Sequence, residues 1–309
     1  MPRTNHQELV LDEGHDRALT IEAPGKINLA LHVVGRREDG YHLLESLTVF
    51  TRFGDHLTVE NAEADSFVAT GPFAKYMPLG DDNLVVTARD RLRAAFPLAD
   101  CPPVAISLEK NMPIASGLGG GSSDAAATLI ALSSIWDLTT TKRELAQLGP
   151  ALGADVPMCV AAKPLLASGI GERIAMVPSF PELSLVLVNP GVPVPTAKVF
   201  GALATYQNPG LPPLPEQPSL DSLVAWLGRT RNDLEATARS IAPEIDDALH
   251  ELGLTGAQIA RMSGSGATCF GLFENDLQAQ GAARHIRRER PNWFVVATRT
   301  GGAGLNVAD

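Results

Sequence analysis

The sequence feature that most constrains the fold is the stretch "ASGLGGGSSDAAATLIAL", residues 115–132, where four glycines precede an alanine- and leucine-rich run. The run predicts a helix over residues 122–134, and glycine weakens regular structure, so four glycines directly before a helix need a reason. Glycine adopts positive φ at little cost, which lets successive backbone N–H groups turn inward and join the unpaired N–H groups of the first helical turn. We therefore interpret residues 117–124 as a phosphate-binding loop at a helix N-terminus.

Three simpler interpretations of this loop explain less. A helix cap needs one polar residue and one or two glycines, not four. A P-loop of the form GxxxxGK[ST] needs a lysine that does not follow these glycines. A dinucleotide-binding GxGxxG motif would have glycine or alanine where Ser122 stands, and it would follow the first strand of the chain. The loop is therefore a phosphate site of a different class.

The chain has 309 residues, more than one domain usually holds, so we expect two domains that share a cleft. Strand and helix patterns are mixed in both halves, which predicts an α+β fold. We place the boundary near residue 175, with residues 1–175 in an N-terminal domain that carries the phosphate loop and 176–309 in a C-terminal domain. The net charge of −10 argues against a protein that coats nucleic acid or an anionic membrane.

Local patterns predict most elements. Residues 19–34 are expected to form two strands around Pro24-Gly25, residues 35–47 a loop, and residues 47–60 a hairpin. A helix is expected over 82–96, capped by Asp81 or Asp82. Further expected elements are helices over 122–134, 141–153, 222–228, 241–254 and 276–290, a buried strand over 183–191, a closing strand over 292–300, and an exposed, stiff proline-dense linker over 208–220.

The cysteines and the N-terminus bear on location. Cys101, Cys159 and Cys269 are widely spaced and form no CxxC pair, which is typical of reduced thiols in a cytosolic protein. No apolar run approaches the roughly 20 residues that span a bilayer. Residues 1–18 are polar and of mixed charge, which favours a short disordered arm over a signal peptide. We expect a cytoplasmic protein.

The segment "PIASGLGGGSSDAAA", residues 113–127, resembles the second signature of the GHMP kinases. Residues 23–47, 152–160 and 263–273 are similar to other motifs of that superfamily, in the same order along the chain. The resemblance implies a two-domain GHMP kinase fold with the active site in the cleft between the domains, and ATP as phosphoryl donor. Mg²⁺ is expected on chemical grounds, because it neutralises the charge of the β- and γ-phosphates. The GGGSSDAA form and the segment 23–47 are similar to one branch, in which ATP phosphorylates the 2-hydroxyl of a cytidine diphosphate-linked methylerythritol in the non-mevalonate isoprenoid precursor pathway.

The resemblance also implies catalytic roles. Asp155 matches the general base, since an attacking hydroxyl needs an acceptor for its proton as the new P–O bond forms. Lys26 matches a cation that keeps Asp155 ionised and stabilises charge on the attacking oxygen. Without the resemblance, Lys26 would be interpreted as an exposed turn lysine, and for Asp155 a general base and a helix-terminal or turn residue would be equally good interpretations. Asn28 shares a strand face with Lys26 and is expected to orient the substrate.

Other residues match binding positions. Tyr41 offers a ring to stack on cytosine, His42 offers hydrogen bonds to its edge, Phe200 closes the other side, and Thr196 contacts the substrate. ATP is expected to be held by Asn83, Lys110, Gly117, Leu118, Gly119, Gly120, Gly121, Ser122, Ser123, Gly264, Ser265 and Gly266. The sequence identifies no protein ligand for Mg²⁺. Two alternatives stay open: a GHMP kinase for another acceptor, such as homoserine or a mevalonate derivative, and a catalytically silent sensor of nucleotide or metabolite.

Overall fold

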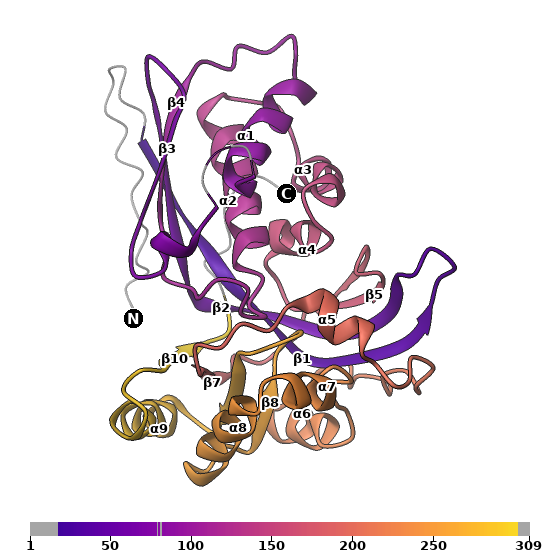
Figure 1. The fold of residues 1–309 in the computed structure, drawn as a ribbon. Coiled ribbons are helices and arrows are strands. Elements are labelled where there is room, and N and C mark those ends of the chain that lie inside the picture. The colour runs from indigo at the N-terminus through magenta and orange to yellow at the C-terminus, as the bar shows by residue number, and fades with distance from the viewer. Residues whose placement is uncertain (1–17, 79, 81, 302–309) are drawn as a thin grey trace, which may run out of the picture.

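The computed structural model describes residues 18–78, 80 and 82–301. The described chain forms an upper and a lower half, each a β-sheet with helices packed against it (Figure 1), and the two halves meet along the longest strands. The mixture of helices and sheets confirms the expected α+β class. The expected N-terminal arm, apart from residue 18, and the cap assigned to Asp81 lie outside the described residues.

The sheet of the first half is built around two long strands. β1 (Ala18–Arg36) and β2 (His42–Asn61) pair antiparallel over their whole length. The remaining strands are β3 (Ser66–Thr70), β4 (Val104–Glu109), β5 (Leu165–Gly169) and β6 (Arg173–Met176). The order is β3-β4-β2-β5-β6, with β1 paired to β2, and β3 runs parallel to β4. One half of β2 thus pairs β4 and the other half pairs β5, which makes β2 the centre of the sheet.

The long hairpin corrects three sequence predictions. Residues 19–34 form one strand with a bulge between Pro24 and Lys26, not two strands. Residues 47–60 lie within β2 rather than forming a hairpin, and the expected loop over 35–47 shrinks to residues 37–41. Gly54 looked like a turn residue because glycine marks turns, but a Cβ there would lie 2.2 Å from the carbonyl oxygen of Ala23. The glycine allows two strands to approach closely at the bulge.

The helices of the first half cover one face of this sheet. They are α1 (Leu84–Ala95), α2 (Gly120–Ile135), α3 (Lys142–Leu148) and α4 (Val156–Ala161), with short 3₁₀ turns η1 (Ala74–Tyr76) and η2 (Gly149–Ala151). α2 packs against α1, α4, β1 and β2, and its residues 123–133 are all buried. Asn83 caps α1 by accepting from the Val85 N–H, so the expected cap at Asp82 is wrong. The helix expected over 141–153 is α3 followed by η2.

The second half holds a four-stranded antiparallel sheet. Its strands are β7 (Ser184–Asn189), β8 (Ile259–Met262), β9 (Cys269–Phe273) and β10 (Phe294–Arg299), in the order β10-β7-β9-β8. Its helices are α5 (Thr196–Gly201), α6 (Leu220–Leu227), α7 (Glu235–Ile241), α8 (Glu244–Leu254) and α9 (Asp276–Glu289). The sequence patterns did not predict α7. The boundary placed near residue 175 stays a prediction, and β6 ends at Met176 while β7 begins at Ser184.

The proline-dense segment is anchored to the fold rather than forming a free linker, while several of its residues are exposed as expected. The Trp226 indole is fully buried and donates from Nε1 to the carbonyl oxygens of Pro212 and Pro213, at 3.2 and 3.1 Å. The Leu211 N–H donates to Glu45 Oε2 at 2.7 Å, which ties the segment to β2. Carbonyl groups that lack helical or sheet partners must find others when buried, and Trp226 supplies one here.

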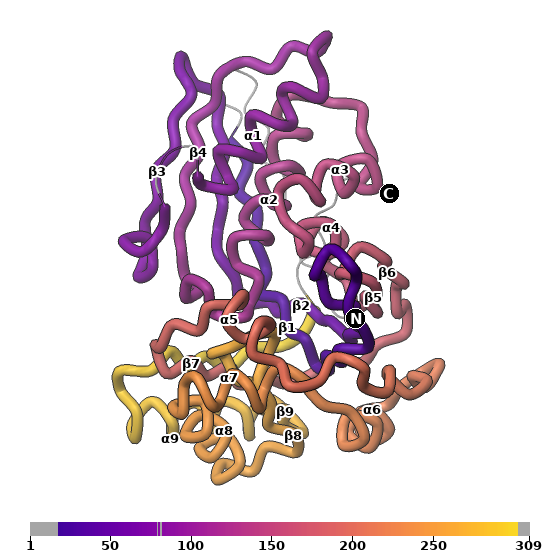
Figure 2. The backbone as a smooth tube through the Cα atoms, turned by 45° about the vertical axis from the view of Figure 1, so that its right-hand side comes forward, coloured from indigo at the N-terminus to yellow at the C-terminus, as the bar shows by residue number. Residues whose placement is uncertain are grey.

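The two halves share a hydrophobic core. Ile27 and Leu29 of β1 and Leu47 of β2 belong to one buried cluster with Leu187 of β7 and Phe270 of β9. Both views show the β1–β2 hairpin crossing from the upper half onto the lower half (Figures 1 and 2). Because protein interiors are close-packed, this shared core holds the facing loops of the two halves in a defined relative position.

Candidate active site

A cleft with a volume of about 870 Å³ is lined by residues of both halves. The residues named from the sequence that line it are Lys26, Asn28, Tyr41, His42, Gly117, Gly119, Gly120, Gly121, Ser122, Asp155, Thr196, Phe200, Gly264 and Ser265. Leu118, Ser123 and Gly266 belong to the same loops but do not line the cleft. Asn83 and Lys110 line a second, smaller cavity. The structure thus brings most of the predicted site residues together.

Lys26 and Asp155 form an ion pair inside the cleft. Lys26 Nζ donates to Asp155 Oδ2 at 2.8 Å, and the two side chains are 7% and 38% exposed. Lys26 follows the β1 bulge, and its backbone N–H donates to the Leu118 carbonyl of the glycine loop at 2.8 Å. Asp155 stands at the N-terminus of α4, yet its carboxylate does not cap that helix. The carboxylate is therefore free to face Lys26 and a substrate hydroxyl.

The glycine loop presents backbone to the cleft. Gly117 and Gly119 have φ of +80° and +64°, and a Cβ on Gly119 would lie 3.1 Å from Lys26 Cε. α2 begins at Gly120 without a side-chain cap and without an acidic residue in its first turn. The N–H groups of that turn are therefore left for a ligand, at the positive end of the helix dipole. Ser123 is not left free in this way, because its hydroxyl donates to the Pro24 carbonyl at 2.8 Å and is buried.

A turn from the second half is joined to this loop. The Ser263 hydroxyl donates to the Gly117 carbonyl and accepts from the Asn28 N–H, both at 3.1 Å. Asn232 Nδ2 donates to the carbonyls of Met262 and Gly264, each at 2.8 Å. A Cβ on Gly117 would lie 2.4 Å from the Ser263 carbonyl oxygen. The two glycine-containing loops therefore meet backbone to backbone at one side of the cleft.

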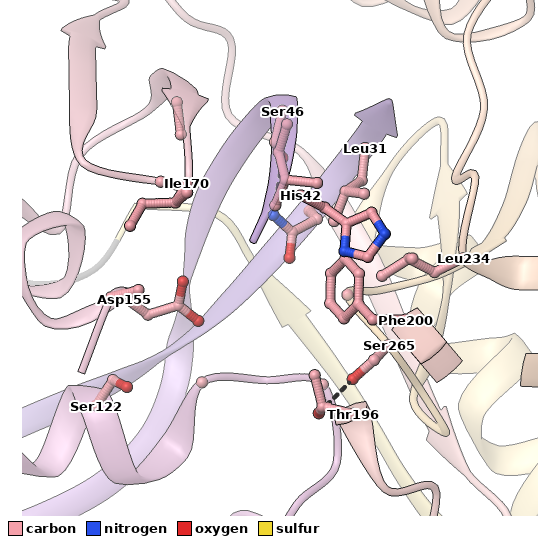
Figure 3. A pocket seen from close by; sticks show the side chains of 18 of the residues that line it. Leu31, His42, Ser46, Ser122, Asp155, Ile170, Thr196, Phe200, Leu234 and Ser265 are labelled. Atoms are coloured by element: carbon pink, nitrogen blue, oxygen red, sulfur yellow. Dashed lines mark hydrogen bonds between the residues drawn. The ribbon is translucent and has the colours of Figure 1, made fainter. Parts of the chain in front are cut away.

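The polar side chains of Asn28, Thr196 and Ser265 also line the cleft. Asn28 is buried and donates from Nδ2 to Ser46 Oγ at 2.7 Å and to Thr48 Oγ1 at 3.2 Å. Its Oδ1 has no hydrogen-bond partner among the residues that the structure describes. Thr196 Oγ1 and Ser265 Oγ share a hydrogen bond of 2.8 Å (Figure 3). A hydroxyl-bearing substrate would supply a donor to Asn28 Oδ1.

Aromatic rings gather at the other side of the cleft. Asp155 and Ser122 lie on one side of the pocket, and His42 and Phe200 lie on the other (Figure 3). The His42 and Phe200 ring centroids are 5.1 Å apart with planes tilted by 32°. Tyr41, at the tip of the long hairpin, is 61% exposed. Burial lowers the pKa of His42, and the nearby Arg36 charge lowers it further, so its neutral form is favoured.

Sequence reasoning missed two residues at this aromatic end. Arg36 lines the cleft and lies directly opposite His42 in the β1–β2 ladder. Its guanidinium carbon is 5.9 Å from the centre of the Tyr206 ring, whose edge faces His42 at a centroid distance of 6.1 Å. Arg36 stands five residues before Tyr41, within the segment 23–47 that resembles a GHMP kinase motif. Its place in that motif could therefore have identified it as a site residue. Tyr206 follows α5 in a stretch without a pattern, and nothing in the sequence points to it.

The structure gives Lys110 and Asn83 partners within the protein. Lys110 Nζ donates to Asp55 and Asp124 at 2.5 and 2.6 Å and is fully buried. Asn83 accepts from the Val85 N–H and donates to the Pro78 carbonyl. Both residues line the second cavity, of about 190 Å³, and Gly120 and Gly121 line both cavities. The ATP contacts expected of Lys110 and Asn83 stay a prediction, and the Lys110 ammonium already donates hydrogen bonds to two carboxylates.

The described residues contain no group of three or more histidine, cysteine, aspartate or glutamate side chains that could hold a metal ion. The donor set therefore does not fit a metal site built by the protein alone. Mg²⁺ commonly keeps several waters and binds through substrate phosphates. Binding of that kind does not require a cluster of protein ligands.

Comparison with known families gives two matches. Residues 83–163 match the GHMP kinases N terminal domain, and residues 216–292 match the GHMP kinases C terminal domain. The first match covers the glycine loop and Asp155, and the second covers the turn that contains Gly264.

Relatives and solved structures agree with these matches. The chain is 56% identical over 281 residues to a 4-diphosphocytidyl-2-C-methyl-D-erythritol kinase of Mesorhizobium japonicum, covering 91% of this chain and 95% of that protein. It is 50% identical to the kinase of the same name from Brucella abortus, covering 92% and 95%. A crystal structure of 4-(cytidine 5'-diphospho)-2C-methyl-D-erythritol kinase superposes with a TM-score of 0.76 at 33% identity, covering 92% of this chain and all of that one. Homoserine kinase from Cytophaga hutchinsonii shares the fold, with a TM-score of 0.67 at 16% identity and coverage of 96% and 98%.

Proposed function

Because the chain belongs to the GHMP kinase family, we propose that its cleft binds ATP and 4-diphosphocytidyl-2-C-methyl-D-erythritol together and transfers the γ-phosphoryl group to the substrate 2-hydroxyl. The products are ADP and the 2-phosphorylated compound, an intermediate on the non-mevalonate route to isoprenoid precursors. The observation that carries this proposal is the Lys26–Asp155 pair, which lies in one cleft with an uncapped helix N-terminus and a cluster of aromatic rings.

Phosphoryl transfer depends on positioning and on stabilising charge. In the proposed reaction the 2-hydroxyl lies against Asp155, which accepts its proton as the oxygen attacks the γ-phosphorus. The Lys26 ammonium, 2.8 Å from the carboxylate, keeps Asp155 ionised and stabilises negative charge on the attacking oxygen. The N–H groups of residues 119–122 hold the phosphates through the loop and the first turn of α2. Mg²⁺ supplies neutralisation of the β- and γ-phosphate charge when it is bound with ATP.

The substrate spans the cleft from Asp155 to the aromatic rings. Its cytosine stacks against Tyr41 and Phe200, and His42, held neutral by burial, offers hydrogen bonds to the base edge. Asn28 Oδ1 accepts from a hydroxyl of the methylerythritol, because that oxygen is buried and has no partner in the described part of the chain. Thr196 lies beside Ser265 on the opposite wall and contacts the same part of the substrate.

Two other predictions accompany this proposal. Among the described residues, no helix combines the length and the apolar character that crossing a membrane requires. The cytoplasmic location and the lack of a nucleic-acid partner, both expected from composition and charge, stay predictions that fractionation and a filter-binding assay would test.

The test is ATP-to-ADP turnover by purified protein with Mg²⁺ and one of four conditions: the cytidine compound, homoserine, mevalonate or no acceptor. We expect turnover with the cytidine compound alone. Turnover with another acceptor would keep the family and remove the cytosine-stacking role of Tyr41 and Phe200. ATP binding without turnover in any condition would instead indicate a sensor.

A further inference from the structure

Three charged side chains lie buried beneath the start of α2, outside the main cleft. Lys110 Nζ donates to Asp55 Oδ2 at 2.5 Å and to Asp124 Oδ2 at 2.6 Å. The Lys110, Asp55 and Asp124 side chains are 1%, 0% and 2% exposed. Two carboxylates therefore share one ammonium. If all three groups were ionised, the cluster would carry one excess negative charge on buried side chains, which is costly.

Hydrogen bonding distinguishes the two carboxylates. Asp55 Oδ1 accepts from the Asn111 and Met112 N–H groups at 2.6 and 2.8 Å, and Oδ2 accepts from Lys110, so both oxygens of Asp55 have donors. Asp124 Oδ1 is buried and has no hydrogen-bond partner among the described residues. Burial raises the pKa of Asp124 to about 8, against the opposing effect of Lys110 and with a further rise from the Asp55 charge. Asp124 is the carboxyl group that takes up the proton.

The surroundings of Asp124 add little compensating positive charge. α1 contributes apolar side chains to the core around the first turns of α2, among them Val85 and Ala88. Asp82 before α1 lines the same small cavity as Lys110 and Asp124, and the Cys159 thiol of α4 lies within the influence of the charges of Asp155, Lys26 and Asp124. His56 on β2 follows Asp55 but is 44% exposed and lies against Glu22 and Glu109. Lys26 is paired with Asp155, and burial raises the pKa of the Cys159 thiol, which keeps it neutral.

The cluster directly contacts the phosphate loop. A Cβ placed on Gly120 would lie 3.0 Å from Lys110 Nζ, so the ammonium packs against the first residue of α2. Asp124 stands one turn further along the same helix, and Asp55 holds the backbone of residues 111–112, which lead into the loop. A negative charge at this position would oppose the phosphates of ATP, whereas a neutral cluster would not.

We propose that Asp124 is a positioning residue that holds a proton when ATP binds, so that Asp55, Lys110 and Asp124 form a neutral support for the phosphate loop. Loss of this proton at alkaline pH weakens ATP binding. The inference rests on the proposed function, because it assigns the loop to ATP.

The test measures the Kd of ATP by titration calorimetry, without acceptor, from pH 7 to pH 9. For the wild type, we expect the Kd to rise by up to about tenfold, the most that one linked proton with a pKa of about 8 gives over this pH range. Asp124→Asn and Asp55→Asn should each flatten this rise. Either variant leaves one carboxylate paired with the Lys110 ammonium, so the cluster is neutral without an extra proton that could be lost. Asp90→Asn, which removes an exposed aspartate of α1, should keep the wild-type rise.

A second readout does not depend on ATP. Infrared spectra at pH 7 should show the carbonyl band of a buried protonated carboxyl group in the wild type, and Asp124→Asn should lack it. Absence of that band from the wild type, or an unchanged pH dependence of the Kd in both carboxamide variants, would overturn the inference. If Asp124→Asn failed to fold, the pH dependence of the ATP Kd in Asp55→Asn and the infrared spectrum of the wild type would still test the inference. Absence of ATP binding at every pH would contradict the proposed function, while the infrared band would still test the proton.

Discussion

The two ends of the cleft are built differently. At the reacting end, Lys26 is nearly buried, Gly117 contacts the Ser263 backbone, and the loops of both halves are joined by hydrogen bonds. At the aromatic end, Tyr41 is 61% exposed on a hairpin tip, and Phe200 stands on the six-residue helix α5. The reacting end combines a side-chain ion pair with backbone that is held in place by packing, whereas the aromatic end includes an exposed side chain on a hairpin tip and a ring on a short helix.

This difference indicates that the two ends of the cleft serve different functions. Phosphoryl transfer needs its groups held in one geometry, and backbone inside a shared core supplies that. Recognition of a base depends mainly on the area of aromatic ring that it can stack against. Exposed side chains supply that area without changing the stability of the fold. Changes at the reacting end should therefore affect kcat and stability, and changes at the aromatic end should affect the KM of the cytidine substrate alone.

The largest effect is expected from Asp155→Ala. Loss of the proton acceptor should lower kcat by about 10²- to 10⁴-fold, the usual contribution of a general base. Asp155 does not cap α4, but its loss leaves the nearly buried Lys26 ammonium unpaired, so thermal stability should fall together with kcat. ATP binding, measured by calorimetry, should persist. A kcat near that of the wild type would remove Asp155 from the base role.

Gly117→Ala should disturb the reacting end through the backbone. Alanine at φ +80° costs about 1–2 kcal/mol, and its Cβ would also collide with the Ser263 carbonyl oxygen. We expect a loss of unfolding free energy greater than that strain alone, together with a weaker Kd for ATP.

Gly191→Ala is the matched control, because Gly191 also has φ +80° but open space where a Cβ would lie. The difference between the two variants in urea unfolding isolates the contact between the loops. Equal losses in both variants would mean that the contact adds nothing to stability.

At the aromatic end, Tyr41→Ala should raise the KM of the cytidine substrate and leave kcat, ATP binding and thermal stability unchanged. Base–aromatic stacking is worth about 1–3 kcal/mol, which corresponds to an increase of about 5- to 150-fold. Tyr76→Ala is the control, because Tyr76 is equally exposed, at 60%, and does not line the cleft. An unchanged KM for Tyr41→Ala would argue against stacking.

The same contrast explains what the sequence could predict. The glycine loop, the residues around Lys26 and the segment of Asp155 carry local patterns, and the α+β fold and the kinase family that they implied are confirmed. The long β1–β2 hairpin was predicted as four short strands, because Gly25 and Gly54 look like turn residues until the close approach of two strands is known.

Contacts between distant segments could not be predicted from one sequence. Asp55, Lys110 and Asp124 come from three separate elements, so nothing in the local pattern shows that Lys110 is shared by two carboxylates. Tyr206 approaches His42 only because the segment after α5 folds back over the hairpin. In both cases tertiary packing, not local sequence, decides the environment of the side chain.

The smallest expected effect concerns the pH dependence of substrate recognition. The pKa of His42 is lowered from 6.5, first by burial and then by Arg36, so the folded state binds this proton less readily than the unfolded chain. Its contribution to stability is therefore present above pH 6.5 and is lost as the pH falls below that value. Protonation would also add a second charge beside Arg36 and desolvate a cation against the base.

We expect the KM of the cytidine substrate to rise on acidification from pH 7.5 to pH 5.5, by less than about tenfold, since one partly exposed group is involved. His42→Gln should flatten that rise, because glutamine keeps a hydrogen-bonding edge and cannot titrate. His250→Gln on α8 should retain it. If the KM of His42→Gln followed the same pH curve as the wild type, another group would be titrating, and the aromatic end would depend on ring contact rather than on the charge of His42.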